Sequence, residues 1–305
     1  MVDVTLLGVG GTYPLPKRFL TSLYCNYNGN GVLIDAGEGT QIAMKANDIS
    51  PTSISTILIT HFHGDHTLGL PGVLLSMHNG GRTRPVTIIG PKGIEDVVGG
   101  LIKAAGRIDF EINFKEIEYD EQKFELDKDF YAMAFKVKHS SDVECYGFTL
   151  NVTRKREFLV DKVKEANIPL QYWKDIQSGK DVGNFKANDY LGPNRNGIKV
   201  CYSTDTRPCE LLLKNAKNSD LLILEAMYLA DNFERAEDKA HMLACEAMEI
   251  ARRVKAPKLW LTHYSPMVTN DEIRDFADRF KNYEWLEAPT KAVHTKLLYK
   301  NNKKD

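Results

Sequence analysis

Three histidines and an aspartate lie within the six residues HFHGDH, which begin at position 61. Imidazole nitrogens and carboxylate oxygens are common ligands of zinc and other divalent metals. On an extended backbone, His61 and His63 point to the same side. Gly64 allows the chain to turn back before Asp65 and His66. This segment therefore predicts ligands for two metal ions, with His61 and His63 on one and Asp65 and His66 on the other.

Further candidate ligands stand where other apolar runs end. His139 follows the alternating run YAMAFKVK, and His263 ends the run KLWLTH. Asp205 follows the apolar run Ile198–Tyr202, and a carboxylate in such a place can bridge two cations. Each of these residues alone is more often structural, but with HFHGDH they form a candidate two-metal site. Two ions about 3.5–4 Å apart can activate water, so we expect hydrolytic chemistry.

The elements that must position these residues alternate along the chain. Apolar runs predict strands at Val2–Leu7, Ser22–Tyr27, Gly31–Asp35, Ile54–Thr60, Val86–Ile89 and Ile198–Tyr202, with a hairpin-like stretch near Phe124–Val137. Helical patterns occur at Gly39–Ala46, Leu68–His78, Gly93–Ala105, Glu210–Ala216, Ala240–Val254 and Asp271–Phe280. This order favours an α/β sandwich, with layers of helix, sheet, sheet and helix, over an all-β barrel.

Composition limits the classes of function. The 305 residues carry 40 Lys and Arg against 41 Asp and Glu, which excludes a globally basic nucleic-acid coat. No apolar stretch is long enough to span a membrane. The first residues, MVDVTLLGVGG, do not resemble a secretion signal, so we expect a cytoplasmic protein. Five cysteines without close pairing predict free, mostly buried thiols.

We expect a single domain over residues 1–305 with a polar insertion at about 151–195. Between positions 152 and 195 there are nine Lys or Arg and six Asp or Glu, a local charge of +3. A simple surface insertion and an arm that grips substrate are both compatible with this composition.

The sequence resembles the metallo-β-lactamase superfamily and, within it, the ribonuclease Z family. HFHGDH matches the superfamily motif HxHxDH, and similarity to ribonuclease Z extends to LIDAGEGTQ at 33–41, GLPG at 69–72, IGPKG at 89–93 and DTRPC at 205–209. The resemblance runs from Leu6 to about Ser265. It implies a metallo-β-lactamase-like αββα sandwich, in which two packed mixed β-sheets are flanked by helices. It also implies two Zn²⁺ per chain, replaceable by Mn²⁺ or Co²⁺, and a homodimer.

The resemblance assigns each metal ligand a place. It implies that one zinc is held by His61, His63 and His139, the other by Asp65, His66 and His263, and that Asp205 bridges the two.

The resemblance also implies catalytic and substrate-binding residues. His241, which we expect to begin the helix Ala240–Val254, would donate a proton to the leaving oxygen. Glu225 would orient His241 and raise its pKa. Asp65 would accept the proton of the attacking water as well as bind metal. Substrate contacts are implied for Ser265, Lys17 and Arg18.

The activity that the resemblance implies is endonucleolytic removal of the 3′ trailer of precursor tRNA, which leaves a 3′-hydroxyl and a 5′-phosphate. Two departures from the family pattern keep alternatives open: the insertion lacks the usual Gly-Pro pair, and Ser265 is followed by Pro266 where the family has Arg-Tyr. The alternatives are a phosphodiesterase for cyclic or short nucleotides and a non-catalytic binding protein with a decayed site.

Overall fold

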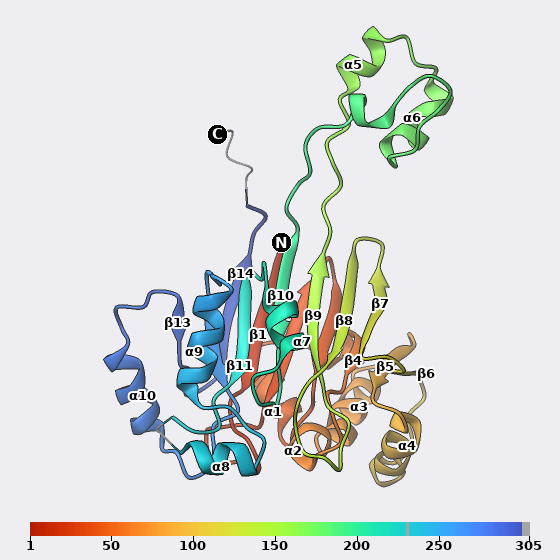
Figure 1. Cartoon of the computed structure of the whole chain (residues 1–305). Coiled ribbons are helices and arrows are strands. Elements are labelled where there is room, and N and C mark those ends of the chain that lie inside the picture. Colours follow the sequence, from red (N-terminus) through yellow and green to blue (C-terminus); the bar gives the residue numbers. More distant parts are fainter. Residues whose placement is uncertain (230–231, 301–305) are drawn as a thin grey trace. The chain divides into compact units, whose positions relative to one another are not determined.

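The computed structural model describes residues 1–229 and 232–300, and these divide into two compact units (Figure 1). Unit 1 comprises Met1–Asn151 and Ile198–Leu298, and unit 2 is formed by Val152–Gly197 with the start of the C-terminal tail. No helix among the described residues has the length and apolar character needed to cross a membrane.

Unit 1 contains two seven-stranded mixed sheets. The first has the order β14-β1-β2-β3-β4-β5-β6. Its antiparallel part pairs β14 with β1, β1 with β2 and β2 with β3, and β3 to β6 are parallel. The strands are β1 Val2–Gly8, β2 Ser22–Tyr27, β3 Asn30–Ile34, β4 Ile54–Leu58, β5 Val86–Gly90, β6 Ile112–Glu116 and β14 Val293–Leu297.

The second sheet has the order β13-β12-β11-β10-β9-β8-β7. Strands β10 to β13 are parallel, and β7 and β8 form the antiparallel hairpin expected near Phe124–Val137. The strands are β7 Glu121–Asp127, β8 Phe130–Lys136, β9 Tyr146–Val152, β10 Ile198–Tyr202, β11 Leu221–Glu225, β12 Leu259–Thr262 and β13 Leu286–Glu287.

Helices flank both sheets of unit 1 (Figure 1). They are α1 Thr40–Ala46, α2 Gly64–Thr67, α3 Leu70–Asn79, α4 Ile94–Ala105, α7 Glu210–Ala216, α8 Phe233–Asp238, α9 Ala244–Arg253 and α10 Asn270–Arg279, with a 3-10 turn at Pro51–Ser53. Val73 and Met77 of α3 pack with Leu33 of β3 and Ile57 of β4 in one buried cluster. Helix α9 contacts β11 and β12 of the other sheet. The expected αββα sandwich is therefore confirmed.

One expected helix begins later than the sequence pattern suggests. Helix α9 starts at Ala244, not at Ala240. Ala240 has φ 53°, a left-handed conformation that ends α8, and the backbone N–H of His241 donates to Ala236 O at 2.9 Å. His241 therefore lies in the connection between α8 and α9. The expected helix therefore included the four residues of the connection that precede α9.

Cys25, Cys145 and Cys201 are buried free thiols, as expected. Cys209 is half-buried, and Cys245 is exposed on α9.

Unit 2 has a small apolar core of its own. It contains α5 Val160–Glu165, α6 Leu170–Gln177 and a 3-10 turn at Ala187–Tyr190. Val163, Ile176 and Leu191 are buried together, and Trp173 packs at their edge. The guanidinium of Arg156 donates to the carbonyls of Leu191 and Gly192, which ties the two chain segments that enter this unit. The composition of this polar segment did not reveal such a core.

Candidate metal centre

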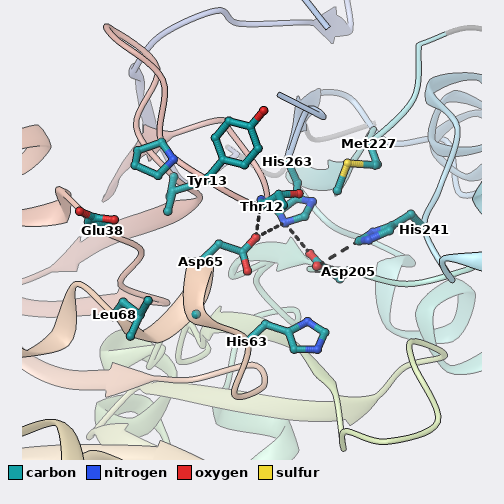
Figure 2. A pocket seen from close by; sticks show the side chains of 13 residues that line it. Thr12, Tyr13, Glu38, His63, Asp65, Leu68, Asp205, Met227, His241 and His263 are labelled. Atoms are coloured by element: carbon teal, nitrogen blue, oxygen red, sulfur yellow. Dashed lines mark hydrogen bonds and ion pairs between the residues drawn. The ribbon is translucent and has the colours of Figure 1, made fainter. Parts of the chain in front are cut away.

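The candidate ligands converge from the loops that follow different strands. The ligand atoms of one group all lie within 4.8 Å of one another, and the group consists of His61, His63, His139 and Asp205. Asp65, His66 and His263 form a second group by the same measure. Asp205 and His263 also form a group with His241, so the groups are contiguous. Figure 2 shows Asp65, Asp205, His241 and His263 around one space, with His63 below them.

Asp35 fixes the orientation of two of these histidines, and it was not recognised in the sequence as more than part of a motif. Its carboxylate accepts hydrogen bonds from the backbone N–H and the hydroxyl of Thr60, both at 2.9 Å. It also lies 2.8 Å from Nδ1 of His66. Because the Thr60 proton is used on Asp35, Nδ1 of His61, 2.9 Å from the Thr60 hydroxyl, must be the donor of that pair.

This arrangement sets the tautomers that metal binding requires. With Nδ1–H of His61 donating to Thr60 and that of His66 donating to Asp35, Nε2 of each ring keeps its lone pair. The Nδ1–H of His139 likewise donates to Ala240 O at 3.1 Å. Three imidazoles thus present Nε2 lone pairs to the centre. Such outer hydrogen bonds are typical of metal-ligating histidines.

The residues present fit a divalent metal. Nε2 of His61 and Oδ1 of Asp205 are buried and have no hydrogen-bond partner among the described residues. Nε2 of His263 lies 3.2 Å from Oδ1 of Asp205 and from Oδ2 of Asp65. Buried polar atoms without a partner are costly, and a cation coordinated by nitrogen and oxygen satisfies them together. The centre therefore takes a metal cofactor.

The pKa values in the centre reflect the balance between burial and neighbouring charge. Burial, with the nearby imidazole of His66, lowers the pKa of His61. Burial raises the pKa of Asp205, but His263 and His66 outweigh it and hold this pKa well below its usual range. For His66, burial lowers the pKa, whereas Asp205, Asp35 and Asp65 together raise it well above its usual value. The carboxylates that raise the pKa of His66 are the groups that would stabilise a bound cation in place of its proton.

His241 and Glu225 form a pair at the edge of the centre. Nδ1 of His241 lies 3.0 Å from Oε2 of Glu225, which is fully buried at the end of β11. The other oxygen of Glu225 accepts the backbone N–H of Thr206. Burial lowers the pKa of His241, but the Glu225 carboxylate outweighs it and raises this pKa to about 9. His241 lines two cavities of about 520 and 710 Å³, so its ring is accessible to a ligand.

The residues expected to contact substrate differ in their placement. Lys17 is exposed, and Ser265 lines the larger cavity. Arg18 is only 2% exposed, because its guanidinium donates to Val268 O at 2.7 Å and to Ser265 O at 3.3 Å. Arg18 therefore holds the loop that follows His263, and a substrate contact of its own stays a prediction.

Two other residues of the N-terminal loop were missed. The backbone N–H of Thr12 donates to Oδ2 of Asp65 at 2.6 Å, and Tyr13 lines both cavities. Both lie in the Gly- and Pro-rich loop after β1, where the sequence offers no ligand-type residue as a signal.

Two family models match parts of this chain. The family model described as Anti-Pycsar protein Apyc1 matches residues 2–169, which is more than half of the chain and places it in the family so described. The model described as a β-lactamase superfamily domain matches residues 191–264.

Named relatives are similar along most of their length. The chain is 44% identical over 290 residues to a ribonuclease Z of Agathobacter rectalis, covering 92% of this chain and 94% of the relative. It is 42% identical over 282 residues to a ribonuclease Z of Clostridium acetobutylicum, covering 89% and 91%. The chain belongs to the ribonuclease Z family. The resemblance seen in the sequence is confirmed, and this ribonuclease Z-family chain also shares its fold with human tRNase Z, short form, at a TM-score of 0.70, 22% identity and coverage of 96% and 98%.

The role of Asp35 leads to a testable prediction. Asp35→Asn removes the negative charge that faces His66 but keeps the shape of the side chain. We expect metal affinity to fall about 10–100-fold, as is typical when an outer partner of a ligating histidine is lost. Titration against a chelating fluorophore measures this affinity, and Asp48→Asn, on the exposed end of the α1 connection, serves as the matched control. An unchanged metal affinity in Asp35→Asn would show that metal binding does not depend on the charge of Asp35 beside His66.

Proposed function

We propose that this chain is a metal-dependent endoribonuclease that removes the 3′ trailer of precursor tRNA and leaves a 3′-hydroxyl and a 5′-phosphate. One observation carries the proposal: a His/Asp ligand set lies beside His241, which lines an accessible cavity and is paired with the buried Glu225. Membership of the ribonuclease Z family supports tRNA as the substrate, and the relatives are named for that activity class.

The proposed cofactor is a pair of zinc ions. One ion would be held by His61, His63 and His139. The other would be held by Asp65, His66 and His263, and Asp205 would bind both ions. When bound, zinc ions act as Lewis acids toward a phosphodiester and make water nucleophilic at neutral pH. The absence of cysteine from these groups favours hydrolytic zinc over a structural zinc site. Mn²⁺ and Co²⁺ suit the same donors.

The chain's own residues move the protons in this mechanism. Asp65, whose pKa is held below its usual range by His66 and His263 against the effect of burial, is ionised at neutral pH and can accept a proton from the attacking water. His241 carries a proton at neutral pH because Glu225 stabilises the imidazolium. It donates this proton to the leaving oxygen of the ribose. The backbone N–H of Thr206 donates a hydrogen bond to Glu225 and so helps to stabilise its negative charge.

Unit 2 is the proposed grip on the polynucleotide. It holds none of the ligand groups, and its segment carries the local charge of +3 noted above. Exposed lysines such as Lys162, Lys164 and Lys174 can bind phosphates without taking part in chemistry. A homodimer, in which unit 2 of one subunit grips substrate cut by the other, belongs to the same proposal, as does a cytoplasmic location.

A phosphodiesterase for cyclic or short nucleotides is the second candidate. The metal groups, Glu225 and His241 all belong to unit 1. Such an activity requires the metal centre and the Glu225–His241 pair but no grip outside unit 1. Substrate choice therefore separates the two candidates.

One prediction of this proposal concerns substrate choice and salt. We expect the zinc-loaded protein to cleave precursor tRNA at low salt, and its binding to weaken steeply as salt rises, by a slope of about 0.7–0.9 per phosphate contact. Lys162, Lys164 and Lys174 changed together to Gln should weaken tRNA binding and lower this slope, yet spare hydrolysis of bis(p-nitrophenyl) phosphate.

The matched control for that prediction changes Lys92, Lys103 and Lys115 to Gln, three exposed lysines of unit 1. It should leave both substrates unaffected. If the wild-type protein hydrolyses the small diester but leaves precursor tRNA intact at low salt, the tRNA proposal is wrong and the second candidate stands.

Another prediction of this proposal concerns His241→Ala. Loss of a general acid typically costs about 10²–10⁴-fold in rate. We expect this loss on an RNA diester, whose ribose oxygen leaves poorly, and a much smaller one on a p-nitrophenyl diester, whose leaving group needs no proton. Metal content, measured by atomic emission, should equal that of the wild type. Equal losses on the two substrates would assign His241 a role other than proton donation.

A further inference from the structure

Arg207 is a buried cation that two helices hold in one orientation. Its side chain is 6% exposed, and the ring of Phe233 covers the guanidinium at 5.2 Å. Nη1 and Nη2 each donate to a different oxygen of Glu246 at 2.6 Å, and Nε donates to Glu237 at 2.9 Å. Glu237 belongs to α8 and Glu246 to α9. A two-pronged pair of this kind fixes geometry as well as adding energy.

The same guanidinium reaches the connection that carries His241. Nη1 of Arg207 donates to the backbone carbonyl of His241 at 2.7 Å. Glu246, held by Arg207, accepts the backbone N–H of Leu243 at 2.9 Å. The backbone that follows the His241 Cα is therefore tied to one ion pair at two points, the carbonyl of His241 and the N–H of Leu243. Since His241 lies outside both helices, helical hydrogen bonds do not fix its ring position by themselves.

The backbone of the Arg207 segment is tied to the metal centre at the same time. Two residues before it stands Asp205, the ligand shared between the groups. The N–H of Thr206 donates to Glu225, and the N–H of Arg207 donates to Lys138 O, next to His139, at 2.7 Å. Three consecutive residues thus contact the ligand set, the carboxylate that faces His241, and the backbone of His241.

We propose that Arg207 is a positioning residue that holds the His241 imidazole at a fixed place relative to the metal centre. The proposal rests on the proton-donor role proposed for His241. Four of the five N–H groups of the Arg207 side chain donate to Glu237, Glu246 and the His241 carbonyl. The guanidinium is therefore used within the fold and is not offered to the substrate. Its effect on the reaction would pass through the His241 connection, where a displacement of about 1 Å can cost about 10²-fold in rate.

The test compares Arg207→Met with wild type and with His241→Ala, all loaded with zinc. Methionine keeps an apolar stem beneath Phe233 but removes every donor of the fork. We expect kcat on an RNA diester to fall about 10²-fold, with a much smaller fall on bis(p-nitrophenyl) phosphate. KM and metal content should remain those of the wild type. The double variant should be no slower than His241→Ala alone, because both changes remove one function.

The matched control is Arg252→Met. Arg252 is an exposed arginine of α9 that pairs with Glu249 on the surface, so its loss should change neither substrate's rate. If Arg207→Met does not fold, Glu246→Gln weakens the same fork from the partner side, and we expect it to show the same selective loss on the RNA diester.

Three results would overturn the positioning role. Equal losses on the two substrates, or a loss of metal, would show that Arg207 acts on Asp205 and the centre. Losses that add in the double variant would show that Arg207 acts independently of His241. By contrast, if the rate of His241→Ala falls equally on both substrates, His241 is not the proton donor. That result would overturn the proposed function of His241, whereas the three results above concern only the role of Arg207.

Discussion

Four carboxylates lie almost out of reach of water at one edge of the two sheets, and their charge must be balanced within the fold. Asp35 and Glu225 are fully buried, Asp205 is 2% exposed, and the Asp65 side chain is 11% exposed. An isolated carboxylate in such surroundings would be strongly destabilising. Each one is matched by a specific group: Asp35 by His66 and Thr60, Glu225 by His241, and Asp65 and Asp205 by the imidazoles around them and the metal that they could hold.

The fold meets this requirement by bringing strand ends together. In parallel strands the carboxyl ends meet at one edge, so loops after β3, β4, β10, β11 and β12 deliver their polar residues to one place. Backbone connections then set the distances between these loops. The segment Asp205–Arg207 is the clearest case, because it contacts the ligand set, Glu225 and the His241 connection within three residues. The same short segment therefore carries a candidate ligand and holds the neighbouring loops in place.

Much of the centre could be predicted from the sequence because its ligands follow recognisable apolar runs. HFHGDH, His139, Asp205 and His263 each stand at the end of such a run, and the strands predicted at Ile54–Thr60 and Ile198–Tyr202 lie where the structure has β4 and β10. Asp35 also ends a strand, but its role depends on the pairing of β3 with β4, which brings it to Thr60. Pairing across strands is not visible in a linear pattern.

Other features depended on tertiary contacts that local sequence does not encode. The basic side chain of Arg18 suggested a ligand contact, yet backbone carbonyls at 265 and 268 take its donors. His241 lies between two helices because Ala240 adopts a left-handed conformation that its side chain does not favour. The apolar core of unit 2 is spread over five buried residues in a polar segment, so no continuous run revealed it.

We propose that seven residues of the centre hold two metal ions, and anomalous X-ray scattering at the zinc absorption edge tests this proposal most directly. Crystals of the chelated protein reloaded with zinc should give two strong peaks per chain. We expect one peak within bonding distance of His61, His63 and His139, the other near Asp65, His66 and His263, and Asp205 between them. A single peak, or zinc bound elsewhere with these side chains unliganded, would contradict the two-metal centre.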